Sequence, residues 1–276
     1  PTESAILNLI FTCCPVRAVT REKRKSTVQL AHSFVYVYTS SAHLVHPKGK
    51  IAYNSTNGYV YMTAQNSDCM VILDVGSNAG APPLYVGSYC SSTDLDAPTD
   101  MSYDASRGYV YVAAYEVGLV IIDVGTDPSS PSKLGSYISS TYLDGAHGVN
   151  HAASGLVFAS GHECDCVVVV DVVTNAASPQ YIGSYCDSTY LSAPMDLVFD
   201  ETSKLLFVAA SGTDRLTIID VGTDPSIPSL VGSCMSATYL DNAIGIALAG
   251  IAQIFGRKLL NIVYVASDRV PVINSS

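Results

Sequence analysis

Val71-Ile72-Leu73-Asp74-Val75 decides how this chain folds, because closely related segments recur along the sequence. The three other copies are Val120-Ile121-Ile122-Asp123-Val124, Val168-Val169-Val170-Asp171-Val172 and Thr217-Ile218-Ile219-Asp220-Val221. Their aspartates stand 49, 48 and 49 residues apart. A fixed period of this length is typical of a chain assembled from repeated structural units.

Each repeat contains short apolar segments rich in Val, Ile, Tyr and Phe, which are separated by Gly, Pro, Ser and Asp. In the second repeat these segments include 101–103, 109–112 and 120–122, and a Gly-Ser pair follows at 135–136. Such segments are typical of β-strands. Four strands per unit at this spacing match the blade of a β-propeller, so we predict an all-β fold.

The two ends of the repeated region look like complementary halves of one further unit. Residues 36–51 resemble only the second half of a repeat, and residues 245–276 resemble only the first half. Four whole units and two halves predict a β-propeller of five four-stranded blades over residues 34–276, with the last blade closed by both termini. Such closure would remove an exposed sheet edge. A fragment of a larger ring is the alternative.

The repeated template resembles the LVIVD repeat family. It reads Val-Ile-Ile-Asp-Val, then an Asp-Pro-x-x-Pro loop at 127–131 and 224–228, then Gly-Ser near the next strand. This resemblance covers residues 36–276 and implies a β-propeller. It also implies a secreted or cell-surface protein, since these repeats are found largely in such proteins of prokaryotes. Most of those proteins have no assigned activity.

Charge and hydropathy restrict the partners that we expect. The chain of 276 residues carries a formal net charge of −10, and five of its fourteen basic residues lie between 17 and 25. An acidic ring argues against binding of nucleic acid, which needs a basic patch. No apolar run reaches the length of about 20 residues that spans a bilayer. We therefore expect an extracellular or cell-surface location, without a transmembrane segment.

Residues 1–33 do not follow the repeat. They are predicted to be an N-terminal extension: a poorly ordered segment, a residual pro-segment, a strand lying on the ring or translated non-native sequence. The eight cysteines are interpreted chiefly as small buried side chains in strands, because cysteines at matching positions of different blades are too far apart to pair. A disulfide between neighbouring loops is the alternative, and Cys164-Asp165-Cys166 is a weak candidate for a metal site.

Candidate functional residues come from the positions where innermost strands enter the channel. Aligned across the repeats, these positions read Lys50, Asp100, Gly148, Asp196 and Gly245, preceded by Gly49, Thr99, His147, Met195 and Ile244. The loops between second and third strands should open on the same face and add further polar side chains. The predicted ligand-binding residues are Lys50, Asp100, Glu116, His147, His162, Asp196 and Asp214.

Two carboxylates and an imidazole suit a divalent cation such as Ca²⁺, and Asp100, His147 and Asp196 are therefore the predicted metal ligands. The alternative is that these polar residues line a solvated channel and bind nothing specific. The repeated motif aspartates, such as Asp123, follow a buried strand and precede a turn, so we expect them to cap that turn.

No nucleophile elbow, phosphate-cradling loop, two-histidine helix motif or EF-hand loop occurs in the sequence, and nothing in it places a serine, a histidine and an aspartate together as a triad. We therefore expect a non-enzymatic binding scaffold whose ligand is a protein, a glycan or another polar small molecule. A hydrolase or lyase acting at the channel mouth, with or without a metal, is one alternative. A purely structural assembly module is the other.

Overall fold

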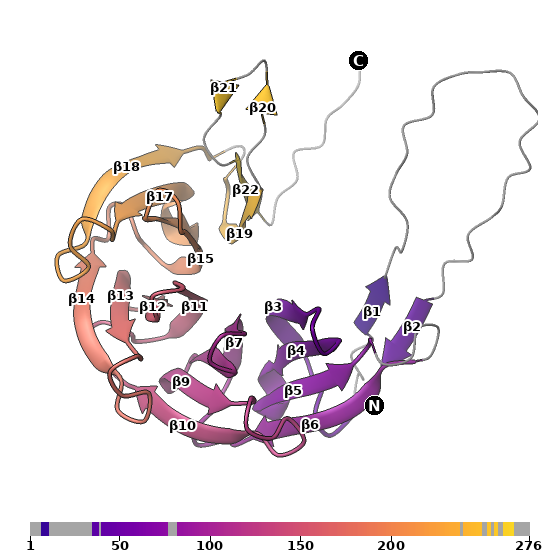
Figure 1. The fold of residues 1–276 in the computed structure, drawn as a ribbon. Helices are drawn as coiled ribbons and strands as arrows, with labels where there is room; N and C mark the ends of the chain where they lie inside the picture. The colour runs from indigo at the N-terminus through magenta and orange to yellow at the C-terminus, as the bar shows by residue number, and fades with distance from the viewer. Residues whose placement is uncertain are drawn as a thin grey trace, which may run out of the picture.

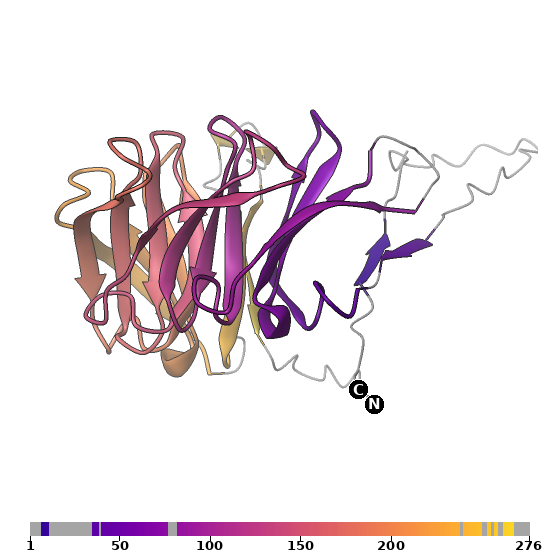
Figure 2. The ribbon, with the colours of Figure 1, turned by 90° about the horizontal axis from the view of Figure 1, so that it is seen from below.

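The structure is a computed structural model that describes residues 7–10, 35–38, 40–76, 82–237, 240–249, 253–254, 257–258 and 262–267. Four antiparallel sheets of four strands follow one another around an arc, as Figure 1 shows. In each sheet the chain runs from the innermost strand to the outermost. Figure 2 shows the same sheets standing side by side. The predicted all-β propeller fold is confirmed.

The strands of the four blades have similar lengths. Blade 1 contains β3 (Pro47–Asn54), β4 (Tyr59–Ala64), β5 (Cys69–Asp74) and β6 (Leu84–Cys90). Blade 2 contains β7 (Pro98–Asp104), β8 (Tyr109–Ala114), β9 (Gly118–Asp123) and β10 (Ser132–Tyr137). Blade 3 contains β11 (Ala146–His151), β12 (Leu156–Gly161), β13 (Cys166–Asp171) and β14 (Gln180–Cys186). Blade 4 contains β15 (Pro194–Asp200), β16 (Leu205–Ala210), β17 (Arg215–Asp220) and β18 (Ser229–Met235).

Single 3₁₀ turns join the second and third strands of two blades, η1 (Gln65–Ser67) in blade 1 and η2 (Ser211–Thr213) in blade 4. Further strands form three two-stranded sheets outside the complete blades. β1 (Leu7–Ile10) pairs with β2 (Val35–Tyr38), β19 (Ala243–Ala249) pairs with β22 (Ile262–Ser267), and β20 (Gln253–Ile254) pairs with β21 (Arg257–Lys258).

The apolar runs of the motif strands are explained by burial on both faces. In β5, the side chain of Ile72 packs into the core between blades 1 and 2, whereas Val71 and Leu73 belong to a core on the opposite face of the sheet. Successive side chains of a strand point to opposite faces. A strand packed between two neighbouring blades therefore needs apolar side chains at every position.

The motif aspartates cap the turns that follow their strands, as predicted. The carboxylate of Asp123 accepts hydrogen bonds from the backbone N–H groups of Gly125 and Thr126, at 2.9 and 3.0 Å, and from the Thr126 hydroxyl. Asp220 makes the same set with Gly222 and Thr223. These carboxylates are part of the blade framework.

The glycine of each Gly-Ser pair lets neighbouring blades approach closely. A Cβ atom on Gly135 of blade 2 would lie only 2.2 Å from the carbonyl oxygen of Ala176, which belongs to the loop after β13 in blade 3. Gly87 meets the corresponding loop of blade 2, and Gly183 meets that of blade 4. A side chain at these positions would push the outer parts of two blades apart.

Closure of the ring by both termini stays a prediction. β19 and β22 begin a fifth sheet, consistent with a further blade. The predicted third strand of that blade, at 272–274, lies outside the described residues. Among the described strands, β2 pairs with β1. β1 lies in the predicted N-terminal extension and β2 lies after the predicted boundary at residue 33, so this sheet crosses the boundary.

Four cysteines form disulfides, which corrects their interpretation as isolated buried side chains. Cys69 is bonded to Cys90 in blade 1, and Cys166 to Cys186 in blade 3. Each pair sits directly opposite across the third and fourth strands of one blade. The pairing at Cys166 also removes its thiolate from the candidate Cys164-Asp165-Cys166 metal site. Cys13 and Cys14 lie outside the described residues.

Candidate binding site at the channel mouth

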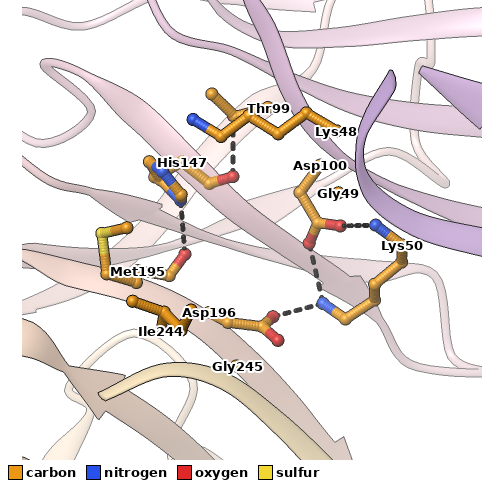
Figure 3. Close-up of a pocket in the computed structure, with 10 residues that line it drawn as sticks. All are labelled: Lys48, Gly49, Lys50, Thr99, Asp100, His147, Met195, Asp196, Ile244 and Gly245. Atoms are coloured by element: carbon orange, nitrogen blue, oxygen red, sulfur yellow. Dashed lines mark hydrogen bonds and ion pairs between the residues drawn. The ribbon is translucent and has the colours of Figure 1, made fainter. Parts of the chain in front are cut away.

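A pocket with a volume of 460 Å³ opens at the inner ends of the blades (Figure 3). Its walls come from the innermost strands β3, β7, β11, β15 and β19. The lining residues are Lys48, Gly49, Lys50, Thr99, Asp100, His147, Met195, Asp196, Ile244 and Gly245. All but Lys48 are positions that the repeat alignment predicts at the channel mouth. Whether they bind a ligand stays a prediction.

Each innermost strand is irregular at the pocket. The pairing of β7 with β8 shifts between Pro98 and Asp100, and that of β15 with β16 shifts between Pro194 and Asp196. The strands β3, β11 and β19 have shifts at the corresponding places. A β-bulge redirects side chains and frees backbone groups from the ladder. The repeated bulge therefore leaves N–H groups for the pocket carboxylates to bind.

Lys50 of blade 1 links the charged groups of the site. Its ammonium lies 2.7 Å from the Asp100 carboxylate of blade 2 and is also ion-paired with Asp196 of blade 4. It donates further hydrogen bonds, at 3.4 and 3.3 Å, to the carbonyl oxygens of Val149 in blade 3 and Leu197 in blade 4. One cation thus connects four blades across the axis.

The two carboxylates also bind backbone N–H groups. Asp100, only 4% exposed, accepts from the N–H groups of Lys50 and Val149 at 2.8 and 3.0 Å. Asp196 accepts from those of Leu197 and Ile246 at 2.7 and 2.9 Å. Each carboxylate therefore accepts hydrogen bonds from three donors, so both are engaged within the protein.

Electrostatics favour an ionised cluster. Burial by itself would lower the pKa of Lys50, but the two aspartates outweigh it and raise the pKa. Burial raises the pKa of Asp196, while the Lys50 ammonium opposes this rise. Because Asp196 receives the ammonium and two N–H donors, we treat its carboxylate as ionised at neutral pH.

His147 stands on the opposite side of the pocket from this cluster. Its Nδ1 lies 2.8 Å from the carbonyl oxygen of Met195 and must carry the proton to bond there. In the neutral ring, Nε2 is then a hydrogen-bond acceptor. Burial lowers the pKa of His147 to about 4, although the bond to Met195 acts in the other direction. The ring is therefore neutral at pH 7.

Lys48 is the pocket residue that the sequence analysis misses. Figure 3 shows its side chain reaching toward the side where His147 lies, away from Lys50. Burial lowers the pKa of Lys48, and its charge also lowers the pKa of His147. Among the ion pairs of the described residues, none involves Lys48.

One more predicted residue, His162, lies beside His147, together with Tyr115. The rings of His147, His162 and Tyr115 lie 5.9 to 6.5 Å apart. Glu163 accepts hydrogen bonds from the Tyr115 hydroxyl and from His162 Nδ1, which holds these side chains together. The bond to Glu163 raises the pKa of Tyr115 to about 12. Glu116 is exposed next to Tyr115 and does not line the pocket.

Asp214, predicted to bind a ligand, forms a hydrogen bond to the chain that enters the next sheet, and its binding of a ligand stays a prediction. Its carboxylate accepts a hydrogen bond from the backbone N–H of Asn242 at 2.8 Å, just before β19. Asp68 binds Ala97 and Asp165 binds Ala193 in the same way, at 3.0 and 2.9 Å. This repeated bond fixes the entry of each following innermost strand, which explains why an aspartate recurs there.

The predicted cation site does not form a compact ligand set. Within the described ranges, no group of three His, Cys, Asp or Glu side chains could hold a metal ion. The ammonium of Lys50 lies between Asp100 and Asp196, and the third predicted ligand, His147, points its Nδ1 at Met195. Binding of Ca²⁺ or another cation therefore stays an untested prediction, and this geometry does not favour it.

Comparison with known proteins agrees with the repeat. The model of the LVIVD repeat matches residues 102–139 and 204–236, which confirms the predicted resemblance. No curated protein matches the sequence of this chain. No helix in the described part of the chain is long and apolar enough to cross a membrane.

Solved structures show the same fold at low sequence identity. A periplasmic gluconolactonase from Pseudomonas aeruginosa has a TM-score of 0.59 at 12% identity, over 72% of this chain and 59% of that one. A putative 6-phosphogluconolactonase from Bacteroides fragilis has 0.58 at 13%, over 68% and 55%. Virginiamycin B lyase from Staphylococcus aureus has 0.53 at 12%, over 73% and 59%. The chain spans less than two thirds of each of these proteins.

Proposed function

We propose that this protein is a non-enzymatic binding scaffold, extracellular or on the cell surface, that holds a small polar ligand in the pocket at the channel mouth. The observation that carries the proposal is the engagement of both pocket carboxylates. Asp100 and Asp196 are bound to Lys50 and to backbone N–H groups, so they brace the blades around a preformed pocket. A pocket of this size is in the range that encloses a small molecule.

The extracellular location rests on two properties of the chain. Disulfides persist in oxidising compartments and are rare in the cytosol. Cys69–Cys90 and Cys166–Cys186 each join adjacent strands of one blade. The net charge of −10 suits a soluble protein that does not bind nucleic acid. Mass spectrometry of the non-reduced protein purified from its native cells tests this part of the proposal.

Ligand binding is tested by a thermal-shift screen with neutral sugars, sugar acids, amino sugars and short peptides. A ligand that binds only the folded protein raises the melting temperature, by an amount that grows with its concentration. A Met195→Trp variant, which fills the pocket from β15, should fold and lose the shift. If no compound stabilises the wild type, or if the variant responds equally, the pocket is not the binding site.

An enzyme acting on a polar substrate is the second candidate. The observation in its favour is the neutral imidazole of His147, which lines the pocket and whose Nε2 is an acceptor that could serve as a general base. Lactonases and a lyase share the fold, but identities of 12% to 13% carry no chemistry across. Turnover of lactones or ester-containing substrates that is lost in His147→Asn would favour this candidate.

A further inference from the structure

We propose that the pocket takes a small hydroxy acid, whose anionic group binds the ammonium of Lys48 and whose hydroxyl donates to Nε2 of His147. The inference deepens the proposed function and rests on it. The charge of this ligand is opposite to that of the cation predicted from the two aspartates.

The need for an anionic group in the ligand follows from the charged side chains of the pocket that already have a partner. The pocket contains two ammonium groups and two carboxylates. Both carboxylates and Lys50 are bound to one another and to backbone groups of blades 1, 3 and 4 and of β19. Lys48 is the remaining charged side chain, half-buried and outside every ion pair of the described residues. Burying an ammonium without a counter-charge costs free energy, and an anionic ligand would supply that counter-charge.

The hydroxyl follows from the state of His147. Its Nδ1–H is used by the carbonyl oxygen of Met195, so the nitrogen that remains on this pocket-lining ring, Nε2, is an acceptor and not a donor. A bare carboxylate offers no proton to such a nitrogen, whereas a hydroxyl does. The ligand therefore needs an acceptor group for Lys48 and a donor group for His147 on the same small molecule.

The remaining walls suit a carbon chain. Met195 and Ile244 present apolar side chains, and Gly49 and Gly245 leave room beside them. The Thr99 hydroxyl is occupied, since it lies within 3.0 Å of the carbonyl oxygens of Ala113, Ala146 and His147. Polar recognition is thus concentrated at Lys48 and His147, which lie toward the same side of the pocket in Figure 3.

Isothermal titration calorimetry at pH 7 and low salt tests the inference with L-lactate, D-gluconate and D-glucuronate. Acetate, which lacks the hydroxyl, and D-glucose, which lacks the charge, are the matched comparisons. We expect at least one of the three hydroxy acids to bind at least tenfold more tightly than either comparison compound. Lys48→Met should weaken that binding at least tenfold and Lys48→Arg should retain most of it. His147→Phe should weaken the hydroxy acid more than acetate.

Lys133→Met is the control variant, because Lys133 is paired with Asp94 on the surface and is not part of the pocket. It should bind as the wild type does. Circular dichroism and melting curves establish that each variant is folded. The inference is overturned if none of the three acids binds, or if Lys48→Met binds them as tightly as the wild type. If only neutral or cationic compounds of the thermal-shift screen bind, and Met195→Trp blocks them, the proposed function stands and this inference fails.

Discussion

Lys50 and Asp196 are 146 residues apart in the sequence, yet their side chains form an ion pair across the axis of the propeller. The same ammonium binds Asp100, so blades 1, 2 and 4 meet at one cation. In most of this fold, neighbouring blades are held by apolar cores. At the axis, the innermost strands are instead joined by charges and by backbone N–H groups that the bulges release.

The first prediction concerns this cation. Lys50→Met should lower the free energy of unfolding by about 3–5 kcal/mol, because it leaves two mostly buried carboxylates without their counter-charge. Denaturant unfolding measures the change. Lys133→Met removes a half-exposed lysine and should cost less than about 1 kcal/mol. Adding Asp100→Asn and Asp196→Asn to Lys50→Met should restore part of the loss, and a loss that deepens instead would show that the ion pairs are not its cause.

The second prediction concerns the glycines between blades. Gly135→Ala and Gly183→Ala should each destabilise the protein by about 1–3 kcal/mol, because the new methyl group would collide with backbone atoms of the next blade. Gly232 is the matched control, since it occupies the same repeat position in blade 4 and no atom of the described residues lies within 4 Å of an added Cβ. Gly232→Ala should be neutral or slightly stabilising. Equal losses at all three sites would mean that backbone freedom, and not blade contact, requires glycine.

The third prediction concerns the disulfides. Replacing both Cys166 and Cys186 by serine should destabilise the protein by about 3 kcal/mol, the loop-entropy estimate for a cross-link closing about 20 residues. Cys234 is exposed and free, so Cys234→Ser should leave the melting temperature unchanged. A reducing agent should lower the melting temperature of the wild type and have no further effect once all four bonded cysteines are replaced. Insensitivity of the wild type to reduction would contradict the prediction.

The fourth prediction concerns metal. We expect a chelator to leave the melting temperature unchanged, because the cation between Asp100 and Asp196 is the Lys50 ammonium. Differential scanning calorimetry with EDTA, and with Ca²⁺ restored in excess, measures this. A lower melting temperature with EDTA that Ca²⁺ reverses would revive the metal site predicted from Asp100, His147 and Asp196.

Repeat spacing predicts the blades and nearly all of the pocket, because every innermost strand enters the channel at the same point of its repeat. Counting residues along each repeat from Asp100 and Asp196 is enough to locate Thr99, His147 and Met195. Lys48 could not, because the alignment counts only two positions per strand. The pairing of β3 also shifts between Lys48 and Ala52, which a sequence pattern does not reveal.

Other features depend on contacts that spacing does not determine. The sequence around Asp214 does not reveal whether its carboxylate faces a ligand or binds the N–H of Asn242, just before β19. The disulfides depend on which third-strand residue stands opposite which fourth-strand residue. That register shifts between Ile72 and Leu73, and comparison of cysteines between blades could not disclose pairing within one blade.

The last prediction concerns pH and His147. Its pKa is about 4 in the folded protein and about 6.5 when exposed, so below pH 6.5 the unfolded chain binds a proton that the folded protein does not. The stability due to the neutral ring is therefore present above pH 6.5 and is lost as the pH falls toward 4. The loss is at most about 3–4 kcal/mol, since the pKa differs between 6.5 and about 4 and one pKa unit corresponds to about 1.4 kcal/mol.

Denaturant unfolding of the wild type and of His147→Asn at pH 7, 6 and 5 isolates this contribution. Asparagine can keep the hydrogen bond to Met195 but does not titrate. Other groups that titrate in this range, including the buried His151, contribute to both proteins and cancel in the difference. We expect the wild type to lose more stability than the variant between pH 7 and 5. Parallel curves would show that His147 is accessible to protons in the folded state, and would remove the neutral acceptor on which the hydroxyl contact depends.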